Sequence, residues 1–107
     1  MSAQFDVVIN SGRVMDPETM YDAVANVGIK DGRIAVITRE EITGRETVDA
    51  TGHVVSPGFI DTHSHWPLPM GYKLGLRDGR TSVMDLEIGT LGTHMDQWYQ
   101  EREGRAQ

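Results

Sequence analysis

Two histidines separated by a single residue are the side chains in this sequence best suited to bind a metal ion. His63 and His65 follow an apolar stretch, and Asp61 precedes the first of them by two positions. Residues two apart in an extended strand project from the same face, so both imidazoles are expected on one face of a strand over residues 59–65. Two imidazoles near a carboxylate suit a divalent ion such as zinc. A bare His-x-His is more often a surface coincidence, so the surrounding sequence has to support this interpretation.

Other side chains that could do chemistry are more ambiguous. Trp66, directly after the pair, could line a substrate pocket, and aromatic packing within the loop is an equal alternative. His53 and His94 lack the spacing of metal ligands and are expected at the surface.

The elements that must position the pair begin with an all-β unit. Runs rich in valine and isoleucine recur at short intervals between residues 4 and 56, which predicts five or six strands. A turn is expected at residues 10–12, and Pro17 should end the next strand because proline has no backbone donor. Asp31-Gly32, between two Val/Ile-rich runs, favours a tight hairpin.

After residue 56 the pattern changes to an alternation of strands and helices. The expected segments are a strand at 59–65, a short helix around 71–76, a strand at 80–87 and a helical tail at 94–102. This alternation is typical of the beginning of a parallel α/β fold. Reactive groups in such folds gather at the carboxyl ends of the strands, which is where the histidines fall. The predicted fold class is therefore α/β.

Composition restricts the partners of the chain. Ten basic and sixteen acidic side chains give a net charge of −6, without a Lys/Arg cluster, so nucleic acid is not an expected partner. The absence of cysteine excludes disulfides and thiolate metal sites. No run approaches the roughly twenty apolar residues that span a bilayer, and the first residues do not form a secretory signal. A soluble cytoplasmic protein with no membrane contact is expected.

The order of residues around the histidines resembles a known family. Residues 57–65, Pro-Gly-Phe-Ile-Asp-Thr-His-Ser-His, resemble the motif at the first barrel strand of the amidohydrolase superfamily. Residues 10–19, 27–34 and 49–52 are similar, in order and spacing, to its N-terminal β-domain. The resemblance is strongest to the N-acyl-D-amino-acid deacylase (D-aminoacylase) group, although the loop after His65 departs from the Asp-Gly continuation common there.

That resemblance implies an incomplete TIM (β/α)8 barrel preceded by part of a small composite β-sandwich. Residues 1–56 would belong to the sandwich and residues 57–107 would form the first βα units of the barrel. One or two divalent metals, usually zinc, would be bound, with His63 and His65 as ligands of the more buried ion and Asp61 as a structural residue. No catalytic residue is expected within this segment, because the general base would lie beyond residue 107.

Glu87 is a further candidate that follows from the resemblance. It lies one position from where D-aminoacylases place a metal-bridging cysteine, so it is either a bridging carboxylate or a polar strand-end residue, and the second interpretation is preferred.

The expected activity is hydrolysis of a non-peptide carbon–nitrogen bond in a small-molecule amide, such as an N-acyl-D-amino acid or a similar linear amide. A cyclic-amide hydrolase of the hydantoinase or dihydroorotase type is the alternative. A third interpretation is a non-catalytic β-rich binding module whose histidine pair is incidental or holds a structural metal. For the enzyme, the segment alone should be inactive. The barrel would be completed by the rest of the chain or by a second subunit, within an oligomer.

Overall fold

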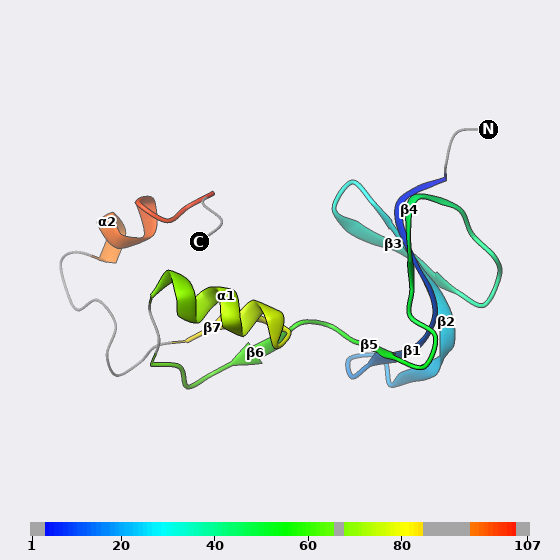
Figure 1. Cartoon of the computed structure of the whole chain (residues 1–107), viewed down its shortest axis with the longest axis horizontal. Coiled ribbons are helices and arrows are strands. Elements are labelled where there is room, and N and C mark those ends of the chain that lie inside the picture. The colour runs from blue at the N-terminus through cyan, green and yellow to red at the C-terminus, as the bar shows by residue number, and fades with distance from the viewer. Residues whose placement is uncertain (1–3, 66–67, 85–94, 105–107) are drawn as a thin grey trace. The chain divides into compact units, whose positions relative to one another are not determined.

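The structure is a computed structural model that describes residues 4–65, 68–84 and 95–104 (Figure 1). The chain divides into two compact units, Met1–Pro57 and Gly58–Gln107, which are described separately. The elements, in chain order, are β1 (Phe5–Asp16), β2 (Tyr21–Lys30), β3 (Arg33–Thr38), β4 (Gly44–Asp49), β5 (Val54–Val55), β6 (Phe59–Asp61), α1 (Pro69–Arg77), β7 (Arg80–Val83) and α2 (Met95–Gln100). No helix within the described ranges has the length and apolar character needed to cross a bilayer.

The first unit is a single five-stranded sheet built around β1. The strand order is β3-β2-β1-β4, and β5 also pairs with β1. β2 is antiparallel to β1 and to β3, whereas β4 and β5 both run parallel to β1. β4 pairs with the first part of β1 and β5 with the later part, so β1 has partners along both edges. The expectation of five or six strands is confirmed.

The expected turn at residues 10–12 is a bulge within one continuous strand. The register between β1 and β2 shifts between Ile9 and Gly12, and Ser11 has a φ of 61°. The amide of Ser11 donates to Oδ1 of Asn26 at 2.9 Å, so the bulge does not leave this donor unsatisfied. The prediction of a turn that interrupts the strand at these residues was therefore wrong, because a bulge absorbs the irregular residues without ending the strand.

The Asp31-Gly32 hairpin is confirmed. Both residues have positive φ, 52° and 71°, as a type I′ turn requires, and they join β2 to β3 directly. The amide of Asp31 donates to Oδ2 of Asp6 on β1 at 2.8 Å, which fastens the turn to the centre of the sheet.

One buried cluster of this unit lies on one face of the sheet, and Phe5, Val8 and Ala50 are buried outside that cluster. Val14, Ala25 and Val27 are buried and pack together, with Ile9, Tyr21, Ile29, Ile37 and Val55 partly buried against them. Several large apolar side chains elsewhere in the unit stay exposed, among them Val24, Ile34, Val48 and Val54. The unit therefore presents apolar surface that its own described residues do not cover.

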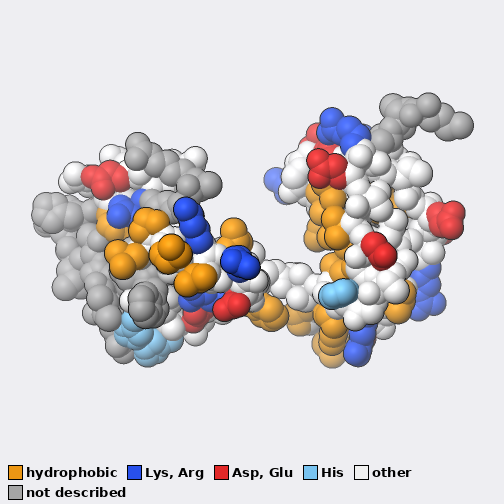
Figure 2. All heavy atoms as spheres, viewed as in Figure 1, with side chains coloured by type: hydrophobic (Ala, Val, Ile, Leu, Met, Phe, Trp, Pro, Cys, Tyr) orange, Lys and Arg blue, Asp and Glu red, His pale blue; other side chains and the backbone are white. Residues whose placement is uncertain are grey.

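The second unit contains a strand–helix–strand unit. β6 and β7 pair in parallel, with Asp61 opposite Val83, and α1 packs against β7. α1 begins at Pro69, whose missing N–H costs nothing in the first turn, and its last turn is followed by Gly79 with a φ of 86°. The helix therefore begins two residues before the predicted range 71–76 and ends one residue after it. Figure 2 shows apolar side chains gathered over this helix beside lysine and arginine side chains.

Candidate metal centre

The two histidines lie in a loop immediately after β6. β6 ends at Asp61, so the predicted strand over residues 59–65 was too long. The chain bends there because Oδ1 of Asp61 accepts the amide of His63 at 3.1 Å. The loop is held to the second strand at Met84, whose amide donates to Asp61 O at 2.8 Å and whose carbonyl accepts the Ser64 amide at 3.0 Å.

The imidazoles nevertheless converge. Nε2 of His63 and Nε2 of His65 lie 2.5 Å apart, with ring centroids 4.6 Å apart and planes tilted by 54°. At that separation one nitrogen donates a proton and the other accepts it. The histidine side chains of the second unit form one patch at its surface in Figure 2.

This convergence fits two ligands of one divalent ion. Tetrahedral zinc with Zn–N bonds of about 2.0–2.1 Å places two ligand nitrogens about 3.3 Å apart, so the rings would need to separate by less than about 1 Å. Within the described residues, no group of three or more His, Cys, Asp and Glu side chains is arranged to hold a metal ion. As ligands, the pair would supply two groups, against the three protein ligands typical of a catalytic zinc site.

Asp61 is occupied in holding the loop. Its Oδ2 accepts a hydrogen bond from Nη1 of Arg80 at 2.6 Å, while its Oδ1 binds the His63 amide. The Arg80 guanidinium, and to a lesser extent the His63 amide, lower the pKa of this carboxyl below its ordinary value. Asp61 is thus an anion at neutral pH whose oxygens point at Arg80 and the backbone.

Arg80 is the residue that sequence reasoning missed. It was assigned only to the beginning of a strand, yet its guanidinium also reaches Ser64 Oγ at 3.2 Å, and Ser64, between the histidines, is buried. A cation at the first position of the strand predicted at residues 80–87, where an apolar residue is usual in a parallel sheet, was the available signal.

Among the remaining sequence candidates, none that the structure describes is brought to this centre. Trp66, Glu87 and His94 lie outside the described residues. His53 lies in the first unit, where it is exposed and its Nδ1 contacts the carbonyl of Thr51 at 3.0 Å.

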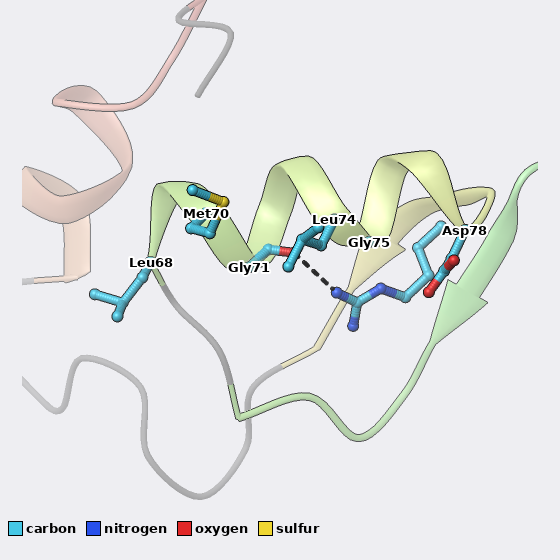
Figure 3. A pocket seen from close by; sticks show the side chains of 7 residues that line it. Leu68, Met70, Gly71, Leu74, Gly75 and Asp78 are labelled. Carbon is cyan, nitrogen blue, oxygen red and sulfur yellow. Dashed lines mark hydrogen bonds between the residues drawn. The ribbon is translucent and has the colours of Figure 1, made fainter.

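A cavity of about 260 Å³ lies along α1 (Figure 3). Leu68, Met70 and Leu74 make most of its lining apolar, and Arg80 also lines it. Neither histidine lines it, so it is not evidence of a substrate pocket at the candidate centre.

Parallel strands joined by a helix, with paired imidazoles after the first strand, are typical of barrel-type metal-dependent hydrolases. No family model matches the chain. Among curated proteins, the chain is 42% identical over 87 residues to a dihydroorotase of Streptococcus pneumoniae, a match covering 79% of this chain and 18% of that protein. It is 32% identical over 101 residues to an allantoinase of Escherichia coli, covering 86% of this chain and 22% of that protein.

Solved structures give the same result for the fold. An L-hydantoinase from Arthrobacter aurescens matches with a TM-score of 0.72 at 23% identity, over 96% of this chain and 25% of that one. An N-acyl-D-glutamate deacylase from Bordetella bronchiseptica, complexed with zinc and a phosphonate inhibitor, matches with a TM-score of 0.62 at 34% identity, over 79% and 19%. A D-aminoacylase, described as defining a subset of amidohydrolases, matches with a TM-score of 0.57 at 35% identity, over 76% and 18%.

The chain belongs to the amidohydrolase superfamily and corresponds to the N-terminal segment of its members. D-aminoacylase is one of several neighbours. The chain spans about a fifth of the length of the curated relatives that it matches, 18% and 22%.

Proposed function

We propose that this chain supplies the first two metal ligands of a hydrolase that cleaves a non-peptide carbon–nitrogen bond. The observation that carries the proposal is the convergence of Nε2 of His63 and Nε2 of His65 to 2.5 Å at the end of the first of two parallel strands. The relatives named above support the reaction class.

The residues of this chain would hold and orient the ion. His63 and His65 would be its ligands, and Asp61 and Ser64 would fix the loop that carries them. A divalent ion at such a site polarises a carbonyl and lowers the pKa of a bound water. The further ligands and the general base are proposed to lie outside residues 1–107, so this segment alone is expected to be inactive.

The proposed substrate is a small-molecule amide, and two classes are supported by different comparisons. A linear substrate such as an N-acyl-D-amino acid is supported by 34% identity to the N-acyl-D-glutamate deacylase and 35% to the D-aminoacylase. A cyclic amide is the second candidate, favoured by 42% identity over 87 residues to the dihydroorotase. The loops that select substrates in barrel enzymes follow many strands, so a segment with two barrel strands does not determine the class.

The barrel is proposed to be completed by further polypeptide, either more of the same chain or a second subunit. The matched relatives are about four times as long as this chain, because the alignments cover only 18% to 25% of their lengths. That the protein is an oligomer, and that it is located in the cytoplasm, both remain predictions.

Replacement of either histidine by alanine tests the proposal. In the assembly of this chain with the polypeptide that completes the barrel, purified without chelator, His63→Ala and His65→Ala should each lower the zinc content measured by mass spectrometry and abolish amide hydrolysis. His53→Ala, an exposed histidine of the first unit, is the matched control and should change neither. Assays on N-acetyl-D-amino acids and, separately, on hydantoin and dihydroorotate distinguish the two substrate classes. Unchanged zinc content in both site variants would contradict the proposal.

A further inference from the structure

We propose that Arg80 is a positioning residue for the metal-binding pair, acting through Asp61 and Ser64 on the loop that carries His63 and His65. This inference rests on the proposed function. It adds Arg80, the first residue of β7, which lies outside the histidine motif.

The guanidinium of Arg80 joins three segments of the second unit. Nη1 donates to Oδ2 of Asp61 at 2.6 Å and to Oγ of Ser64 at 3.2 Å. Nη2 donates to the carbonyl of Gly71 in α1 at 3.3 Å, the bond drawn as a dashed line in Figure 3. One side chain therefore ties the end of β6, the histidine loop and the helix together.

The two residues that Arg80 binds on the loop side are the ones that set the backbone around the histidines. Asp61 uses its other oxygen to accept the amide of His63 at 3.1 Å. Ser64 stands between the histidines, is 7% exposed, and donates its amide to Met84. A displacement of Arg80 would therefore reach both histidines through short, directional contacts.

The helix is shaped to admit this guanidinium. A Cβ added at Gly75 would lie 2.1 Å from Nη2 and 2.4 Å from Nε of Arg80. Gly71 and Gly75 are both buried and stand one turn apart, so they line the same side of α1. Glycine lowers helix stability relative to alanine, so its presence at this contact needs a packing reason, and the arginine gives one.

The Arg80–Asp61 ion pair is partly shielded from solvent and can therefore hold its partners in a defined geometry. The side chains of Arg80 and Asp61 are 22% and 30% exposed, so solvent screens them less than a surface pair. Hydrogen bonds between ionised partners are shorter and stronger than neutral ones, and a planar guanidinium fixes its partners in geometry as well as in distance.

The test is metal affinity in the intact protein, together with any partner that co-purifies. Arg80→Met should weaken Zn²⁺ binding, measured by competition with a chromogenic chelator, by about tenfold to a hundredfold, the usual effect of losing a group that orients a ligand. Arg80→Lys keeps the charge but not the planar fork, and should fall between the wild type and Arg80→Met. Arg77→Met, which removes an exposed arginine from the last turn of α1, is the matched control and should bind Zn²⁺ like the wild type.

Gly75→Ala perturbs the same contact while leaving Arg80 in place. Alanine favours the helix, so a loss of Zn²⁺ affinity in this variant would come from displacement of the guanidinium and not from a weaker helix. The visible spectrum of the Co²⁺-substituted protein should change in Arg80→Met and Gly75→Ala. It should stay unchanged in Lys73→Ala, an exposed position of the same helix.

If Arg80 only stabilises the fold, a different set of results is expected for its variants. If Arg80→Met lowers the unfolding temperature but leaves Zn²⁺ affinity and the Co²⁺ spectrum unchanged, the inference is overturned. If Arg80→Met does not fold, Arg80→Lys and Gly75→Ala decide it by the same two measurements. Failure of the proposed function would look different, because His63→Ala itself would then leave Zn²⁺ affinity unchanged.

Discussion

At the scale of single residues, the histidine loop is set by hydrogen bonds and not by strand geometry. In a pleated strand the side chains of His63 and His65 would project side by side from one face. In the structure their Nε2 atoms instead converge to 2.5 Å from each other. The bend that brings them together is made by the Asp61 carboxylate, which accepts the His63 amide. The separation of the two imidazoles therefore depends on Asp61 and its arginine partner, so under the proposed function substitutions at these positions should act on metal affinity.

Gly12 shows how closely the backbone is packed at the bulge of β1. A Cβ there would lie 2.4 Å from Cγ2 of Val55 and 3.0 Å from Cβ of Ala50. Gly12→Ala should therefore destabilise the protein by about 1–3 kcal/mol in urea unfolding, the usual cost of overpacking.

A double-mutant cycle tests that explanation. Val55→Ala removes the clashing methyl group, so the Gly12→Ala and Val55→Ala costs should couple by about 0.5–3 kcal/mol and not add. Additive costs would show that Gly12 is needed for a reason other than the contact with Val55.

At the scale of elements, β1 organises the first unit because it is long enough to take two successive parallel partners on one edge. β4 pairs with residues from Phe5 to Asn10 and β5 with Arg13 and Val14. Asp6, near the start of β1, ties this strand to both neighbours. Its Oδ2 accepts the amide of Asp31 at the β2–β3 turn, and its Oδ1 binds the guanidinium of Arg45 on β4.

These contacts make the stability of the unit depend on pH. The Asp31 amide, followed by Arg45, lowers the pKa of Asp6 below its ordinary value. A carboxyl with a lowered folded pKa stabilises the fold above its unfolded pKa of about 3.9, and that contribution is lost as pH falls through the folded value. Asp6→Asn should therefore be less stable than the wild type at pH 7, and the difference should shrink as the pH is lowered past about 4.

The comparison with Arg45→Met separates the effect of the Asp31 amide on the pKa of Asp6 from the effect of Arg45. Urea unfolding at pH 7 and at pH 3 should show a smaller pH dependence for Asp6→Asn than for Arg45→Met, because the Asp31 amide still binds the carboxylate in the latter. Equal slopes in the wild type and Asp6→Asn would contradict a role for this carboxyl.

At the scale of the whole molecule, both units present apolar surface in the described residues. Val24 and Ile34 in the first unit are 63% and 66% exposed, and Leu76 and Met70 of α1 are 64% and 66% exposed. A two-stranded parallel sheet is rarely stable alone, because parallel sheets are normally covered on both faces. Further polypeptide over both surfaces is what the proposed barrel and sandwich would supply.

Native mass spectrometry of the protein purified without chelator tests this expectation. We expect an assembly larger than one 107-residue chain, carrying one or two zinc ions per site, and loss of both zinc and amide hydrolysis on dialysis against a chelator. A metal-free, folded monomer of 107 residues would instead support the non-catalytic module, with the histidine pair incidental.

Much of the local structure follows from the sequence, because it depends on residues that are neighbours in the chain. The Asp31-Gly32 turn was predicted from the backbone preference of two residues, and the helix after the histidine loop from a short local pattern. The amidohydrolase motif around His63 and His65 was evident for the same reason, since its residues are consecutive.

Contacts between residues that are far apart in the sequence could be identified only from the tertiary structure. The Arg80–Asp61 pair spans nineteen positions, and the strand containing Arg80 gives no local sign of its partner. The end of β6 at Asp61 was also misjudged, because the predicted strand was carried through the polar residues 61–65, whereas a side-chain-to-backbone hydrogen bond of Asp61 ends it. The sequence by itself determined which residues could bind a metal, through their chemistry and order. Only the tertiary structure decided how the imidazoles converge, because their positions depend on contacts from a second strand and a helix.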